Sequence, residues 1–292
     1  MSLSPAPLGG AAAAAQGVEP GLALAIASAL ALLGYIWIGL LRARVVDGAP
    51  AARRPMRSVP PMALAWTAQF VALYLDISGY GLATPGARFG FAPALSMTMW
   101  LVLTVYLVES RFLPLHSVRR VLAWLAAAAV LLAWSFPGES RPLAASPWAP
   151  LHWVLGLASY GLFGVAVLHA ALLNRAEQQM RRRQPTPGGL PLLQLERLTF
   201  QFVAAGVGVL SLAILLGWWF TLHWKWDHKN LLAVLGWLVL TGLLVGRRLY
   251  GWRGRRATRW LYAGAGLLLL SYAGSRFVLE VILQRAVAGG GA

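Results

Sequence analysis

The feature that most constrains this chain is a series of eight apolar stretches, each close to the length that a helix needs to cross a bilayer. A helix rises about 1.5 Å per residue, so about 20 apolar residues cross roughly 30 Å of hydrocarbon. The stretches lie at residues 21–41, 62–81, 94–110, 121–136, 151–174, 199–222, 231–246 and 260–283. We therefore expect about eight transmembrane helices.

The composition favours the same conclusion. Hydrophobic residues make up 59% of the 292 residues and charged residues only 12%, which is too little polar surface to coat a water-soluble protein of this size. In lipid every backbone polar group needs an internal partner, which restricts spanning structures to helices and closed barrels. Barrel strands show short alternating patterns that these long apolar runs lack. The expected fold class is all-α, a polytopic helical bundle in the lipid bilayer.

The basic residues lie in alternate loops. Nineteen of the 25 lysines and arginines fall in four segments, at residues 42–57, 111–120, 175–197 and 247–259. The positive-inside rule places these segments in the cytoplasm. With eight spans, both termini are then periplasmic, and the chain is a multi-pass protein of the bacterial inner (plasma) membrane. Because this topology accounts for the net charge of +16, no nucleic-acid partner is expected.

The spans and loops divide the chain into six parts. A flexible connector, RRRQPTPGG, lies in one basic loop and separates five spans from three. The expected parts are a periplasmic tail (1–20), a supporting four-helix membrane part (21–136), an outer loop with the fifth helix (137–174), a cytoplasmic loop (175–197), a three-helix part with a tryptophan-rich outer loop (198–283) and a C-terminal tail (284–292).

The outer loop between the sixth and seventh spans is the most unusual segment. It reads GWWFTLHWKWDHKN and contains Trp218, Trp219, Trp224 and Trp226 beside His223, Asp227 and His228. Flat aromatic surface mixed with imidazoles and an acid suits a large planar ligand that carries a metal. The alternative is an aromatic belt, since tryptophan favours the headgroup region of any membrane protein.

Both lysines of the chain, Lys225 and Lys229, lie in this loop, whereas the other 23 basic residues are arginines. Two flexible ammonium groups here are natural partners for a carboxylate such as a propionate. Chance is the alternative, because the number is small. The absence of cysteine excludes disulfides and iron–sulfur clusters, so any redox chemistry needs a borrowed cofactor.

The segment WKWDHKN resembles the tryptophan-rich signature of cytochrome c assembly proteins, the haem-handling CcsA, CcmC and HemX-like membrane proteins, whose core reads roughly W-x-W-D-P-K-E. Trp224, Trp226, Asp227 and Lys229 match this core, while His228 stands at its proline and Asn230 at its glutamate. HWVLGLASYGLFGVAVLHAALL and SYAGSRFVLEVIL are similar to the shorter, YpjD-like branch. The resemblance covers most of residues 151–283.

This resemblance implies a haem (heme) site on the periplasmic face, covered by the tryptophan-rich loop, with two outer histidines as axial ligands. His152 fits the histidine that precedes the tryptophan-rich segment. His228 is the better candidate for the second ligand and His223 is the fallback. The tryptophans, Asp227 and the two lysines are the expected cofactor-binding residues, with Asp227 as a hydrogen-bond acceptor that fixes a ligand's tautomer.

Other ionisable residues in the spans have separate expectations. Asp76, Arg276 and Glu280 lie near outer helix ends, where Arg276 and Glu280 are expected to form a local ion pair. His169 lies seventeen residues after His152, about 25 Å deeper, and belongs to the inner side with His116. Packing is the expected role of these two inner histidines; a part in haem entry from the cytoplasm is the alternative.

The sequence has no P-loop, nucleophile elbow, H-E-x-x-H or C-x-x-C-H motif, so no enzymatic turnover is expected. GAGLLL and GVGV are interpreted as small-residue helix-packing features. The expected function is haem binding and presentation in cytochrome c-type biogenesis and cytochrome complex assembly, with an apocytochrome or another membrane protein as a partner. The alternatives are a small-solute or ion transporter and a non-catalytic membrane regulatory partner.

Overall fold

The computed structural model describes residues 18–41, 59–79, 87–113, 115, 118–137, 139–141, 148–182, 191–220 and 226–278. These residues form an all-α bundle. The helices are α2 (Val18–Leu40), α3 (Val59–Ser78), α4 (Phe91–Glu109), α5 (Arg119–Ser135), α6 (Ala149–Arg181), α7 (Leu192–Phe220), α8 (His228–Tyr250) and a last continuous rod of α9 (Gly254–Leu269), the π-helix η2 (Leu270–Gly274) and α10 (Ser275–Phe277).

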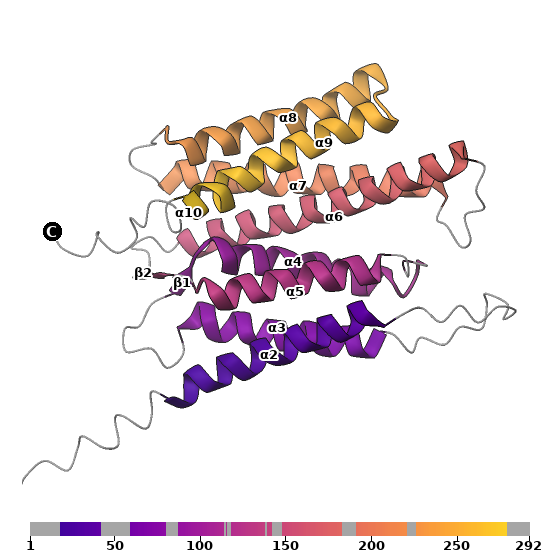
Figure 1. Cartoon of the computed structure of the whole chain (residues 1–292). Helices are drawn as coiled ribbons and strands as arrows, with labels where there is room; N and C mark the ends of the chain where they lie inside the picture. Colours follow the sequence, from indigo (N-terminus) through magenta and orange to yellow (C-terminus); the bar gives the residue numbers. More distant parts are fainter. Residues whose placement is uncertain are drawn as a thin grey trace, which may run out of the picture.

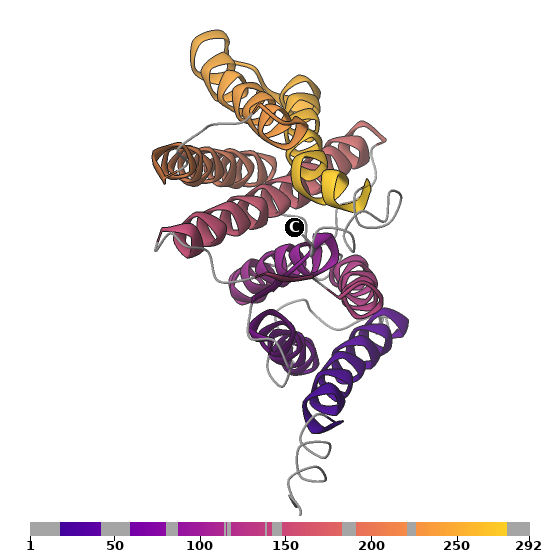
Figure 2. The ribbon, with the colours of Figure 1, turned by 90° about the vertical axis from the view of Figure 1, so that its left-hand side faces the viewer.

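Each predicted span corresponds to one of these eight rods, and the all-α prediction is confirmed. By length and composition alone, five helices are long and apolar enough to cross a membrane, namely α2, α4, α6, α7 and α8. The other three rods are shorter or have a polar end, but they lie alongside the five in both views (Figures 1 and 2). Two three-residue strands, β1 (Ala87–Phe89) and β2 (Glu139–Arg141), pair antiparallel and join the loops that precede α4 and follow α5.

The bundle has two units, each with its own core. Helices α2–α5 pack in one half and α6–α10 in the other, and α4 and α6 meet at the boundary (Figure 1). Buried hydrogen bonds hold the first unit together: the Tyr35 hydroxyl donates to Gln69 Oε1 at 2.7 Å, and Gln69 Nε2 donates to Ser96 Oγ at 3.0 Å. These three residues lie on α2, α3 and α4, so one amide links three helices within the lipid-embedded core.

In the second unit two helices pack closely at a glycine, as predicted for the GAGLLL segment. A Cβ on Gly264 of α9 would lie 2.5 Å from Leu240 Cγ of α8, so only glycine permits this approach. Polar bonds add to the packing. Trp237 Nε1 donates to Ser211 Oγ at 2.8 Å, and Asn174 Nδ2 donates to the Tyr262 hydroxyl at 3.0 Å. These bonds connect α8 to α7 and α6 to α9.

Helices α6 and α7 extend into the segment 175–197, which was predicted as a cytoplasmic loop. Helix α6 continues to Arg181, seven residues beyond the end of the predicted span at 151–174. Helix α7 begins at Leu192, seven residues before the predicted span at 199–222. The prediction followed the apolar run. A helix of polar residues can continue beyond that run, because the backbone makes the same hydrogen bonds between residues i and i−4. With 33 residues, α6 is about 50 Å long and exceeds the hydrocarbon thickness.

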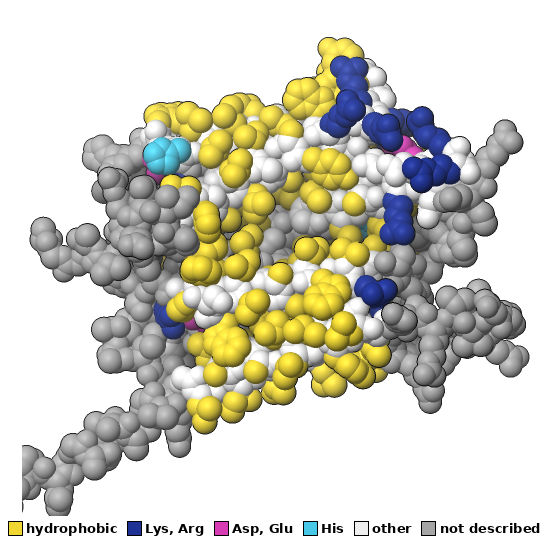
Figure 3. Space-filling view, viewed as in Figure 1, with side chains coloured by type: hydrophobic (Ala, Val, Ile, Leu, Met, Phe, Trp, Pro, Cys, Tyr) yellow, Lys and Arg dark blue, Asp and Glu magenta, His cyan; other side chains and the backbone are white. Residues whose placement is uncertain are grey.

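The surface agrees with a lipid environment. Hydrophobic side chains cover the middle of the helices, and most of the visible lysine and arginine side chains gather at one end (Figure 3). We call this the inner end, since it includes the basic segment that connects α8 to α9. The opposite end, where α7 stops and α8 begins, is called the outer end.

Candidate functional site

Two exposed tryptophans form the C-terminal turn of α7 at the outer end. Trp218 is 64% and Trp219 81% exposed, although large aromatic side chains are ordinarily among the most buried. The sequence placed both where the predicted span at 199–222 overlaps the tryptophan-rich segment, and the structure places them on the helix. They therefore present flat apolar surface from the last turn of α7, directly after Gly217, which lies beside the His152 ring.

His152 lies in the first turn of α6 and is half-buried against α7. Its Nδ1 lies 2.8 Å from the carbonyl oxygen of Ala213. A carbonyl can only accept, so Nδ1 carries the proton and Nε2 of the neutral ring carries the lone pair. A Cβ on Gly217 would lie 2.8 Å from Cε1 of this ring. The glycine therefore leaves room for the imidazole beside the last turn of α7.

On the other side of the tryptophan-rich segment, Asp227 begins α8. It is the N-cap of the helix, and its Oδ1 accepts from the backbone N–H of Asn230 at 2.8 Å. An aspartate at this position satisfies an orphan N–H and complements the positive end of the helix dipole. His228 follows as the first helical residue and is exposed, as is Trp226 before the cap.

The start of α8 is tied to the π-helix in the last rod. The Ser271 hydroxyl, which is buried, donates to the backbone carbonyl of Lys229 at 2.8 Å. The Lys229 ammonium lies 5.5 Å from the centroid of the Tyr272 ring, within cation–π range. Lys229 therefore links the start of α8 to the π-helix.

The described residues of the candidate site thus come from four helical segments at one end of the bundle: α6, α7, α8 and η2. His223, Trp224 and Lys225 lie outside the described residues. Sequence reasoning missed Ser271 and Tyr272. The one local signal was SYAGS in a span, and a π-helix is frequent at functional sites, but nothing in that pattern predicts the partner.

Two other predictions on ionisable residues have different outcomes. The side chains of Arg276 and Glu280 lie outside the described residues, so their ion pair stays a prediction. Asp76 is buried on α3, and its Oδ1 lies 3.3 Å from Arg88 Nη1 of β1. A carboxylate beside a guanidinium reduces the desolvation cost of both charges. The partner was not anticipated, because Arg88 is twelve residues away across a loop.

His169 lies on α6 in the inner half of the bundle, away from His152 as predicted. It is fully buried and its Nδ1 lies 3.0 Å from the Val165 carbonyl oxygen of the preceding turn. Its ring stacks on Phe202 of α7 with centroids 5.4 Å apart. These contacts are consistent with the expected packing role. His116 lies outside the described residues.

Comparison with known proteins decides the family. Residues 65–283, three quarters of the chain, match the family described as Cytochrome C assembly protein. The chain belongs to the cytochrome c assembly family. The match begins inside α3 and includes every described residue of the candidate site, so the site lies within the family's shared region.

Individual members of the cytochrome c assembly family are similar over shorter stretches. "Inner membrane protein YpjD" of Escherichia coli is 34% identical over 149 residues, which cover 48% of this chain and 55% of that protein. "Uncharacterized 28.8 kDa protein in nifR3-like 5'region" of Azospirillum brasilense is 30% identical over 145 residues, 47% of this chain and 53% of that protein. "Cytochrome c biogenesis protein CcsA" of Synechococcus is 31% identical over 107 residues, 32% and 31% of the two chains.

The matched part of the chain spans about half the length of the first two relatives and about a third of the third. No solved structure matches the chain. Together with the apolar helices, the family and the inner-membrane relative make this chain a multi-pass protein of the inner membrane.

Proposed function

We propose that this protein binds haem at the outer end of the bundle and presents it at the periplasmic face during cytochrome c assembly. Family membership supports the assembly role, and the name of the similar Synechococcus protein points to cytochrome c biogenesis. In this proposal the protein acts by binding and presentation and has no enzymatic turnover. The recipient is an apocytochrome or another membrane protein.

The observation that carries the proposal is the state of His152. Iron-binding histidines ordinarily donate their other ring N–H to a carbonyl or carboxylate, which fixes the tautomer and raises the basicity of the ligating nitrogen. The hydrogen bond from Nδ1 to Ala213 has this form, and it leaves the lone pair on Nε2. A neutral imidazole oriented in this way is chemically suited to be an axial ligand of haem iron.

The surroundings of His152 fit the remainder of a porphyrin. Trp218 and Trp219 directly follow Gly217 in the last turn of α7 and offer exposed rings on which a macrocycle can stack and exclude water. The Lys229 ammonium provides a cation for a propionate. The second axial ligand is His228 at the start of α8, or His223 as the fallback. Haem would supply an iron that accepts histidine nitrogens and carboxylates that pair with a cation, and these residues would hold it.

The test is the absorbance spectrum of the full chain, purified in detergent from cells with ample haem supply. We expect a Soret band with a low-spin spectrum, and saturable binding when haemin is added to haem-free protein. His152→Ala should weaken binding and change the spin state, and added imidazole should partly restore both.

A matched pair of tryptophan variants separates the haem site from an aromatic belt. Trp219→Ala and Trp37→Ala each remove an exposed ring, 81% and 56% accessible, on α7 and α2. Neither leaves a large core cavity, so both proteins should accumulate normally. Only Trp219→Ala should lose haem. If wild-type protein shows neither a Soret band nor haemin titration, haem binding is excluded and a regulatory role without haem replaces it.

A further inference from the structure

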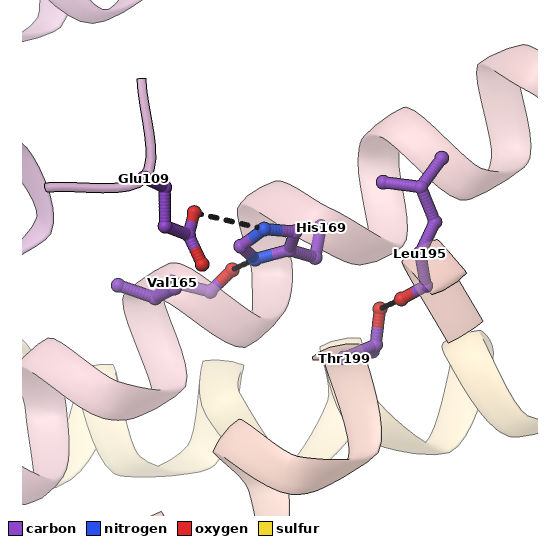
Figure 4. Close-up of polar contacts among 5 residues, drawn as sticks. All are labelled: Glu109, Val165, His169, Leu195 and Thr199. Carbon is purple, nitrogen blue, oxygen red and sulfur yellow. Dashed lines mark hydrogen bonds and ion pairs between the residues drawn. The ribbon is translucent and has the colours of Figure 1, made fainter. Parts of the chain in front are cut away.

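A second cluster of titratable groups lies at the inner half of the boundary between the two units, outside the proposed haem site. His169 of α6 faces Glu109, the last residue of α4, and Nε2 of the ring lies 3.1 Å from Glu109 Oε2 (Figure 4). The imidazole is fully buried and the carboxyl side chain is 14% exposed. Two ionisable groups from separate units therefore meet in an apolar environment.

The hydrogen-bonding pattern determines how many protons the pair must hold. Nδ1 of His169 lies 3.0 Å from the Val165 carbonyl oxygen. Because this oxygen can only accept, the proton of a neutral ring is on Nδ1, and Nε2 then has only a lone pair. An ionised carboxylate also has only lone pairs. At 3.1 Å, with no proton between them, the two atoms would repel each other.

No other described group satisfies Nε2. The nitrogen is buried and has no hydrogen-bond partner among the described residues, and the Glu109 carboxyl oxygen lies 3.1 Å from it as an ion-pair partner. On α7, the Thr199 hydroxyl donates to the Leu195 carbonyl at 2.7 Å (Figure 4). The Phe202 side chain has only its ring to offer. A buried nitrogen without a donor or acceptor is costly.

The charged residues of α7, α8 and α9 have other positions. Glu196 of α7 lies 3.7 Å from both Arg247 and Arg253. Arg197 follows it at the inner end of α7, and the arginines of α9 lie in its first turns. Tyr262 of α9 accepts from Asn174. Among the described contacts of the His169 ring, Glu109 is therefore the charged partner.

We propose that Glu109 and His169 hold one shared proton and that this proton fastens α4 to α6. The proton comes from water and lies on either Nε2 or the carboxyl, which gives an imidazolium–carboxylate pair or a neutral acid–imidazole hydrogen bond. Stacking on Phe202 stabilises the charged ring. The site joins the two units independently of any haem bound at the outer end.

The direct test locates this proton at pH 8, where an exposed histidine is neutral. We expect ¹⁵N NMR of histidine-labelled protein to show a ring with both nitrogens protonated, or infrared spectroscopy to show a protonated carboxyl group. Glu109→Gln should remove either signal, and Glu177→Gln, at a carboxylate of α6 outside this contact, should leave it unchanged. A neutral His169 ring together with an ionised Glu109 would overturn the proposal.

Thermal unfolding in detergent gives an independent test. In Glu109→Gln the amide donates to Nε2, so the link forms without the extra proton. Above about pH 6.5 an unfolded histidine releases its proton while the folded wild type keeps it, so wild-type stability falls as the pH rises. The midpoint difference between wild type and Glu109→Gln should therefore change with pH. A difference that stays constant contradicts a shared proton.

Glu109→Leu completes the series because it leaves Nε2 buried with no donor at all. It should unfold several degrees below Glu109→Gln at every pH, if the variant accumulates. Should Glu109→Leu not fold, the comparison of wild type with Glu109→Gln still decides the proposal. Equal midpoints for the two variants at all pH values would show that Nε2 needs no partner and would also contradict it.

Discussion

Single residues at the outer end have two roles, and variants can separate them. One set forms a surface between α6 and α7 and consists of His152, Gly217 and the exposed Trp218 and Trp219. The other is Asp227, which defines where α8 begins. Both sets belong to the region that resembles the haem-handling signature. Residues that shape the helices affect ligand binding only indirectly, so stability and binding have to be measured together.

Gly217→Ala should weaken haem binding without disrupting the fold. The new Cβ would lie 2.8 Å from Cε1 of His152, so the ring must move and its bond to Ala213 is lost or lengthened. Loss of such a supporting bond typically lowers metal affinity about 10- to 100-fold. Haemin titration measures the change. Gly208→Ala on the same helix is the control, since its Cβ meets nothing within 4 Å; equal affinity of the two variants would contradict the role of His152.

Asp227 is expected to act through its cap. Asp227→Ala removes the acceptor for the Asn230 N–H and should lower the free energy of unfolding by about 1 kcal/mol. Asp227→Asn retains a capping oxygen and should restore both stability and haem retention. Thermal unfolding and the haem-to-protein ratio provide the two measurements. An asparagine variant that folds normally but loses haem would instead assign the carboxylate a direct part in the ligand site.

At the scale of helices, the outer ends of α8 and the last rod depend on each other. The π-helix at Leu270–Gly274 places Ser271 and Tyr272 against the first turn of α8, where the serine hydroxyl reaches the Lys229 carbonyl. Tyr160 of α6 adds a bond to the Leu268 carbonyl just before the π-helix, at 3.1 Å. The segment that carries Lys229 is therefore positioned by two other helices.

Ser271→Ala should loosen this connection. Loss of the bond to Lys229 is expected to cost about 1 kcal/mol and to increase hydrogen exchange in the first turn of α8. Ser275→Ala is a matched control on the same rod, because that hydroxyl bonds only to carbonyls of its own helix, Ser271 and Tyr272. Exchange that rises equally in both variants would indicate general weakening of the rod.

The sequence predicted the number and order of the helices because each span needs a long apolar run. It did not predict where α6 ends and α7 begins, since a helix outside the bilayer depends on local bonding and not on hydrophobicity. Within the site, the residue types of the tryptophan-rich segment were recognisable. The contacts of His152 with Ala213 and of Lys229 with Ser271 were not, because they join residues 61 and 42 positions apart.

At the scale of the whole molecule, charge and polar contacts are unevenly distributed between the two ends. Trp218, Trp219, Asp227 and Lys229 lie at the outer end, while the end of α8, its connection to α9 and the start of α9 together hold six arginines at the inner end. The Glu109–His169 contact lies in the inner half of the boundary between units. The proposed haem and proton sites are therefore on opposite sides of the bundle.

This asymmetry predicts that the outer end faces the periplasm. The chain has no cysteine, so single cysteines report sidedness without background labelling. Trp219→Cys, at an 81% exposed position of the outer end, should react with a membrane-impermeant maleimide in intact spheroplasts. Met180→Cys, 53% exposed beside the inner-end arginines, should react only after permeabilisation. The cysteine-free wild type is the control. Labelling of Met180→Cys in intact spheroplasts would show the reverse orientation. The candidate haem site would then face the cytoplasm, and nineteen of the 25 cations would lie outside, against the positive-inside rule.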